Sequence, residues 1–110
     1  MLLKNIAPIG QRDPKWKDKK LGTSTTTIGD AGCVLCSATI VCRFYGHDVW
    51  PNWLNEQMIK IGGYYDKNLW QWHKLTDIFS DIKVHKLIDC YTTPAPLNEI
   101  NKRLDEGHPV

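Results

Sequence analysis

The chain has 110 residues, of which 42% are hydrophobic and five are Trp, so it can form one globular domain with its own core. The net charge is only +2, and Asp13 and Asp18 flank or interrupt the one lysine-rich stretch, residues 15–20, so we expect no nucleic-acid partner. No stretch approaches the about 20 apolar residues that span a bilayer, and residues 1–9 hold no signal peptide, so we expect no membrane insertion. Localisation stays open.

The cysteines are too few and too clustered for a secreted disulfide framework, so reduced thiols are expected. Three of them fall within ten residues of one apolar stretch. The four are Cys33, Cys36, Cys42 and Cys90. We treat residues 1–110 as a single domain.

The first half of the chain predicts a loop followed by two helices. Residues 1–32 read as irregular, with a short extended piece at 6–9 and a polar Ser/Thr run at 23–27 that is too β-branched for a helix. Residues 33–45 carry one charge, Arg43, are apolar on nearly every side and end at Gly46, which predicts a helix buried on all sides. Pro51 suits the first turn of a helix over about 51–60, which Gly62 and Gly63 end.

The second half predicts a helix, a strand and another helix. Apolar residues recur at helical spacing over 69–79, and residues 82–88 alternate as a strand does. Residues 96–106 predict a helix with an apolar face, closed by Gly107. Residues 108–110 then resemble the start of another strand, so we expect that the chain is cut within an element.

Cys33 has the setting of a reactive thiol. It directly precedes the apolar helix, and a helix N-terminus favours the thiolate. That dipole contributes about 0.3–1 kcal/mol, less than the about 1.36 kcal/mol of one pKa unit, so an imidazolium partner would also be needed. Gly32, which has no Cβ, would let a substrate backbone approach the sulfur.

Several short motifs follow one another in a characteristic order and spacing. They are Gln11-Arg12-Asp13-Pro14-Lys15-Trp16, Leu21-Gly22, Thr27-Ile28-Gly29-x-x-Gly32-Cys33, Ser37-Ala38, Tyr45-Gly46, Pro51, Leu54-Asn55, Gly62-Gly63-Tyr64, Trp72 and Gly107-His108-Pro109-Val110. In this series the chain resembles papain-like cysteine peptidases of the bacteriocin-processing (double-glycine leader) type and their bacterial and phage peptidase-like relatives. The resemblance covers essentially the whole chain. It implies an α+β, papain-like fold of which this chain is the helical N-terminal half, with the β-sheet half truncated.

The resemblance also implies a reaction and two site residues. Cys33 matches the nucleophile of a peptidase that cuts amide bonds through a thioester, and Gln11 matches the glutamine whose amide helps form the oxyanion hole. The substrate would be a peptide or protein, such as a leader peptide at a Gly-Gly junction or a cell-wall cross-bridge. In the family the general-base His lies beyond the segment that matches residues 107–110, so activity would need residues after Val110. His108 occupies a variable position of that segment.

The remaining histidines match no catalytic position and are expected on the surface or in packing contacts. They are His47, His73 and His85. Cys36 lies one turn inside the helix and is expected to be buried. We expect no cofactor and no metal.

Three alternatives remain open. The fold could bind a peptide or protein without cutting it, or serve as a structural part of a larger, possibly phage, assembly. Cys33-x-x-Cys36 at a helix start has the shape of a redox pair, although the usual preceding strand is replaced by a Thr/Gly-rich loop. Cys33, Cys36 and Cys42 with a His could bind zinc, but the second paired motif of such sites is missing.

Overall fold

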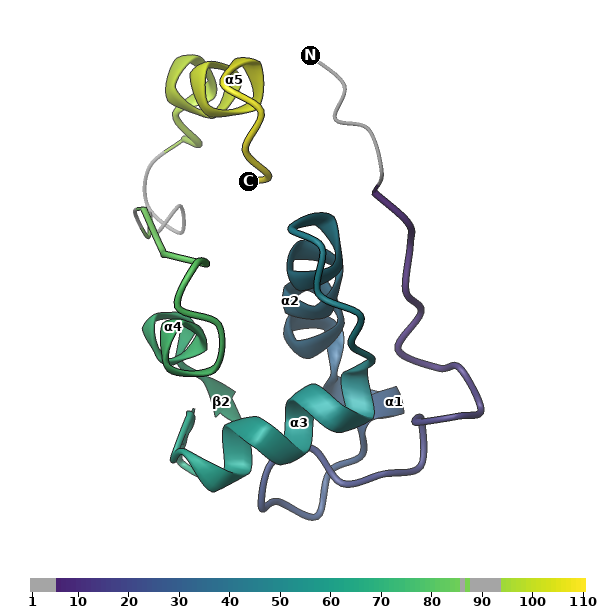
Figure 1. Cartoon of the computed structure of the whole chain (residues 1–110). Helices are drawn as coiled ribbons and strands as arrows, with labels where there is room; N and C mark the ends of the chain where they lie inside the picture. Colours follow the sequence, from purple (N-terminus) through teal and green to yellow (C-terminus); the bar gives the residue numbers. More distant parts are fainter. Residues whose placement is uncertain (1–5, 86, 88–93) are drawn as a thin grey trace.

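A computed structural model describes residues 6–85, 87 and 94–110 of the chain. It is a mixed structure of helices with one two-stranded sheet, which agrees with α+β in general. In Figure 1, helix α2 (Cys33–Phe44) stands in the middle, α3 (Pro51–Lys60) crosses below it, and α4 (Leu75–Ile78) lies beside it. The last helix, α5 (Leu97–Asp105), lies at the opposite end from α3. None of the described helices has the length and apolar character needed to cross a membrane.

Helix α2 forms as predicted but is not buried on all sides. Its buried face contains Leu35, Ala38 and Cys42, together with Thr39, whose hydroxyl donates to the Leu35 carbonyl at 2.8 Å. Val34, on the other side of the first turn, is 39% exposed, and Cys33 and Ser37 are exposed too. The prediction of burial all round is therefore wrong, because the described elements pack against only part of an unusually apolar helix.

The predictions for α3 and α5 are confirmed. Pro51 occupies the first turn of α3, which ends before Gly62, and Gly62 adopts the left-handed conformation with φ +68°. Helix α5 covers Leu97–Asp105, within a residue of the predicted bounds, and Gly107 follows with φ +85°. A glycine reaches this backbone region without the strain that a side chain would add.

The predicted helix over 69–79 is wrong in its first half. Leu69–Trp70 form strand β2, which pairs antiparallel with β1 (Tyr64–Tyr65). The turn between them places Asp66 and Lys67 at φ 48° and 74°, the left-handed geometry of a tight hairpin. Only the second half is helical, as the 3₁₀ turn η1 (Trp72–Lys74) and then α4. In the hairpin, the backbone of residues 69–70 pairs with residues 64–65, whereas the apolar spacing predicts hydrogen bonds within a helix.

The predicted strand over 82–88 is also wrong for its described residues. Ile82 is buried and Lys83 is exposed, so the alternation is real, but residues 82–85 have no strand partner in the described part of the chain. A lone strand has no ladder to hold it. Residues 86 and 88 lie outside the described residues, as does Cys90.

One buried amide joins three parts of the chain. Asn55 of α3 is 4% exposed; its Oδ1 accepts from the Gly22 N–H at 2.9 Å and from the Tyr64 hydroxyl at 2.7 Å. Its Nδ2 donates to the Lys20 carbonyl at 2.8 Å. Gly22 cannot carry a side chain, because it has φ +61° and an added Cβ would clash with the Lys67 carbonyl. Loop 20–22, α3 and the hairpin are thus held together at one side chain.

We expect Asn55→Ala to lower the free energy of unfolding by roughly 2–4 kcal/mol, because it leaves the buried Gly22 N–H and the partly buried Tyr64 hydroxyl and Lys20 carbonyl without their partner. Urea denaturation followed by circular dichroism measures this. Asn52→Ala on the same helix, where Asn52 makes no hydrogen bond to described residues, is the control and should change stability by less than about 0.5 kcal/mol. Equal losses in the two variants would contradict the role of Asn55.

Candidate active site

A short helix that the sequence did not predict leads into Cys33. Helix α1 (Ile28–Ala31) begins after Thr27, whose hydroxyl accepts from the Asp30 N–H at 3.3 Å as an N-cap. Gly32 then separates α1 from α2, and its N–H donates to the Ile28 carbonyl at 2.7 Å. The Ser/Thr run at 23–27 therefore ends in the N-cap of a helix. The signal in the sequence is Thr27, three residues before Asp30.

Gly32 is required by packing inside the chain. A Cβ built at this position would lie 2.5 Å from the Ile28 carbonyl oxygen and 2.6 Å from Ile28 Cγ2. The sequence suggested that Gly32 leaves room for a substrate. The structure gives a different reason, since the missing side chain allows the turn before Cys33 to close on itself.

The Cys33 thiol is presented to solvent at the N-terminus of α2. Cys33 is exposed, and no side chain caps the helix. The first N–H groups of a helix have no intrahelical acceptor, and the N–H of Cys33 has no backbone partner among the described residues. A thiol and an unused N–H donor therefore occupy the same residue.

Gln11 lies against the segment that precedes Cys33. Its Nε2 donates to the Gly29 carbonyl at 3.0 Å, and the side chain is half-buried. The loop that carries it is fixed by Trp16, which is 3% exposed and whose indole N–H donates to the Gly10 carbonyl at 2.9 Å. The Gly29 N–H in turn donates to the Lys17 carbonyl at 2.8 Å.

The structure thus brings two predicted site residues, 22 positions apart in sequence, to one end of α2. The Gln11 amide nitrogen carries two hydrogens, so the bond to Gly29 leaves a second donor. The oxyanion role of Gln11 stays a prediction.

A small, mainly apolar hollow opens beside the first turn of α2, and Cys33 itself is not among the residues that line it. Its volume is about 190 Å³, and Ala31 and Val34, close neighbours of Cys33 in the chain, form part of its wall. Leu69 and Trp70 of strand β2 form another part. The Trp70 indole N–H is buried and has no hydrogen-bond acceptor in the described part of the chain. The sequence did not predict this hollow, because its apolar spacing assigns Leu69 and Trp70, which form part of the wall, to a helix.

The other described cysteines are buried. Burial raises the pKa of the Cys36 thiol to about 11, with a further contribution from Cys33. Burial also raises the pKa of Cys42 to about 12; Asp81 adds to this, and a backbone hydrogen bond opposes it. The predicted burial of Cys36 is confirmed. Burial and a raised pKa make Cys36 a poor redox partner for Cys33, and the described residues bring no three potential metal ligands together.

The histidines are not gathered at Cys33. His47 lies just beyond the C-terminal end of α2, where its Nε2 is 3.0 Å from Asp81 and its ring stacks on Phe79 at 3.9 Å. His108 is bonded through Nδ1 to the Tyr45 hydroxyl at 3.0 Å, at the same end of α2. A helix of 12 residues is about 18 Å long, so both rings are far from Cys33. His73 and His85 are exposed, and within the described part of the chain they make no hydrogen bond or ring contact with Cys33.

Comparisons of the chain with protein-family models, with characterised proteins and with solved structures found no match. The geometry around Cys33 therefore carries the functional argument.

We expect iodoacetamide to alkylate Cys33 well before Cys36 or Cys42 in the native chain, because only Cys33 among these three is exposed. Peptide mapping by mass spectrometry at increasing reaction times would show the order. In about 6 M guanidinium chloride, which unfolds ordinary domains, the three should react at similar rates. Early labelling of Cys36 in the native chain would contradict the burial described here.

We also expect the free energy of unfolding to fall as pH rises above about 8.5. The buried thiols of Cys36 and Cys42 have a raised pKa in the folded chain, whereas an unfolded thiol ionises near about 8.5. The unfolded state then binds fewer protons, so stability declines with pH, by up to about 1.4 kcal/mol per pH unit for each thiol. Urea denaturation in reductant at several pH values measures the slope. Cys42→Ala should flatten it, and an unchanged slope would argue against this origin.

Proposed function

We propose that this chain carries the nucleophile and oxyanion site of a papain-like cysteine peptidase, with Cys33 as nucleophile and Gln11 as oxyanion donor. One observation carries the proposal: an exposed thiol stands at the N-terminus of a partly buried helix, and a glutamine amide is held against the segment leading into it. The family resemblance of the motifs gives the reaction class. The finer fold assignment, the helical half of a papain-like domain, belongs to the same proposal.

The proposed reaction begins when the Cys33 thiolate attacks the carbonyl carbon of a peptide bond. The carbonyl oxygen becomes an oxyanion, which the Cys33 N–H and the Gln11 amide stabilise. The C–N bond then breaks, the amine leaves with a proton, and the acyl group stays on Cys33 as a thioester. Water hydrolyses the thioester, releases the carboxylate and restores the thiol.

The protonation steps need a general base and acid next to Cys33. His47 and His108 lie at the other end of α2, and each already has a hydrogen-bond partner. The proposal therefore takes its imidazole from outside residues 1–110. In this proposal the hollow lined by Ala31, Val34, Leu69 and Trp70 would receive an apolar side chain of the substrate.

Peptide or protein binding without cleavage is the second candidate. The absence of a histidine contact at Cys33 in the described structure favours it. The same hollow and exposed thiol would then form a binding surface, and the Gln11 amide would serve only to hold the Gly29 carbonyl. The two candidates differ in whether this end of α2 stabilises an oxyanion.

A peptide aldehyde distinguishes them, because it adds to a thiolate and forms a tetrahedral adduct with an oxyanion. We expect wild-type chain to bind such an aldehyde covalently through Cys33 in mildly alkaline buffer. Gln11→Ala should weaken the adduct by roughly a hundredfold, the loss seen when one oxyanion donor is removed. In the same variant, iodoacetamide should alkylate Cys33 at the wild-type rate, because alkylation forms no oxyanion.

Gln71→Ala is the matched control, because Gln71 also donates to a glycine carbonyl, that of Gly62, at 3.3 Å. It should leave both reactions unchanged. Cys33→Ser should remove the adduct. If Gln11→Ala and wild type bind the aldehyde equally, the oxyanion site is excluded and the binding module becomes the better description.

A further inference from the structure

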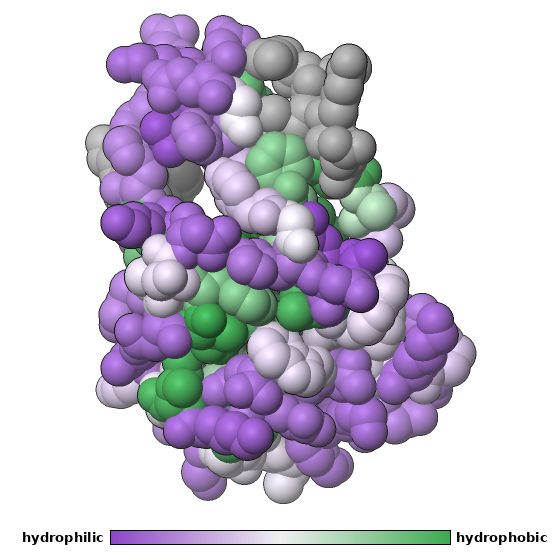
Figure 2. All heavy atoms as spheres, viewed as in Figure 1, coloured by the Kyte–Doolittle hydropathy of each residue, from purple (hydrophilic) through white to green (hydrophobic). Residues whose placement is uncertain are grey.

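A second and larger cavity lies at the opposite end of α2 from Cys33. It has a volume of about 360 Å³ and lies between the C-terminal part of α2, the segment after α4, and α5. Figure 2 shows the surface open between α5, at the upper left, and the rest of the molecule. This volume is within the range of small-molecule sites. Its location separates it from the proposed peptidase chemistry.

The walls of this cavity are mainly apolar. Val41 of α2, Leu75 of α4 and Ile82 line the side formed by the body of the chain, and Ile100 lines the side formed by α5. Helix α5 itself has no buried residue, and its amphipathic face therefore meets a space that the described residues do not fill. Such a wall favours a ligand with an apolar body.

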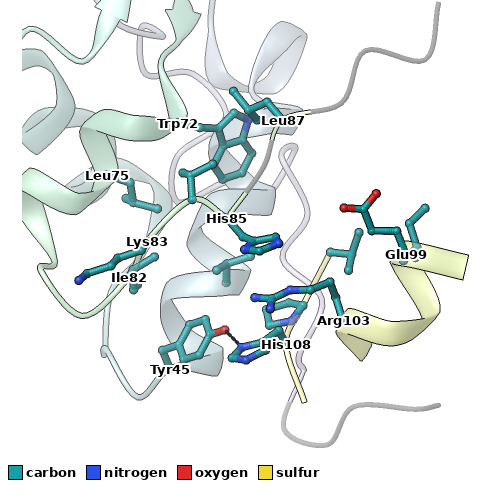
Figure 3. A pocket seen from close by; sticks show the side chains of 15 residues that line it. Tyr45, Trp72, Leu75, Ile82, Lys83, His85, Leu87, Glu99, Arg103 and His108 are labelled. Carbon is teal, nitrogen blue, oxygen red and sulfur yellow. Dashed lines mark hydrogen bonds between the residues drawn. The ribbon is translucent and has the colours of Figure 1, made fainter. Parts of the chain in front are cut away.

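Basic side chains gather at one part of the cavity. Figure 3 shows the Arg103 guanidinium and the rings of His85 and His108 turned toward the same space, while the Lys83 ammonium points away. One N–H donor of Arg103 bonds to the Glu106 carboxylate at 3.2 Å. A guanidinium has five such donors, so others remain for a ligand. Glu99 carries the only side-chain carboxylate among the lining residues, and it already takes part in an interaction.

The charge of Arg103 reaches across the cavity. Burial raises the pKa of Tyr45, at the end of α2, and Arg103 is the group that opposes this rise. The Tyr45 hydroxyl and His108 Nδ1 are 3.0 Å apart, so two more hydrogen-bonding groups stand at the same wall. A guanidinium between an apolar wall and two imidazoles matches the charge and shape of an anionic head group.

We propose that this cavity binds a small amphipathic anion, an apolar chain or ring with a single carboxylate, whose carboxylate is held by Arg103 and whose apolar part lies between α2 and α5. The proposal is independent of the peptidase proposal, since it uses neither Cys33 nor Gln11. It also predicts that the ligand stabilises the chain, because it would join α5 to a body that α5 otherwise contacts little.

Octanoate is a suitable probe and octanamide its uncharged counterpart. Isothermal titration of the whole 110-residue chain should show octanoate binding about tenfold or more tighter than octanamide, as expected for a charge-assisted hydrogen bond. The methyl NMR signals of Ile82 and Ile100 should shift on titration, and the melting temperature should rise. This comparison uses wild-type chain and does not depend on the folding of a variant.

Arg103→Met should weaken octanoate binding by about tenfold or more and leave octanamide unchanged. Lys102→Met, one residue away on the exposed side of α5, is the matched control and should bind octanoate as wild type does. Equal binding of octanoate and octanamide would overturn the proposal, as would unshifted Ile82 and Ile100 signals. A dimer that sedimentation detects and that octanoate does not dissociate would instead assign this face to contact between two copies.

Discussion

The amide of Asn55 is the contact on which the arrangement of this chain depends. Its two ends hold the loop at residues 20–22 and the Tyr64 hydroxyl, and it stands on the helix that crosses below α2. The Asn55 side chain is buried; its bond to the Gly22 N–H is buried too, and its bonds to Lys20 and Tyr64 are partly buried, so water replaces a lost partner poorly. The loop then leads through Thr27 and α1 into Cys33. The position of the Cys33 thiol therefore depends on the Asn55 amide, which has no part in the proposed reaction.

The two ends of α2 are held in different ways. At the N-terminal end, backbone hydrogen bonds join residues 17–19 to residues 28 and 29, and buried Trp16 anchors the preceding loop. At the C-terminal end, one bond between Tyr45 and His108 is the polar contact described between α2's end and the segment after α5. A site that must hold reacting atoms in place suits the first end. A cavity that adapts to a ligand suits the second.

The sequence predicted what depends on local chemistry. The bounds of α3 and α5 follow from Pro51, from the glycines that end them, and from apolar spacing, and the structure confirms them. The burial of Cys36 was likewise expected, from its position one turn inside the helix. These features need information only from neighbouring residues.

The predictions that were wrong depend on partners distant in sequence. Leu69 and Trp70 fit a helical period, and only the left-handed turn at Asp66 and Lys67 pairs them with residues 64–65 instead. Residues 82–85 alternate correctly, yet a strand exists only when another strand lies beside it. The exposed side of α2 was not predicted for the same reason, because an apolar side chain does not show in the sequence whether another element will pack against it.

The contact between Gly32 and Ile28 has a bearing on how variation in this segment should be interpreted. Any side chain at position 32 would clash with the preceding turn whether or not a substrate is present. Loss of function on substituting Gly32 would therefore report on folding and not on catalysis. Cys33 is exposed, and a serine in its place changes one atom with little demand on its surroundings. Substitutions at Gly32 would thus test how the segment packs, and substitutions at Cys33 would test the chemistry of the thiol.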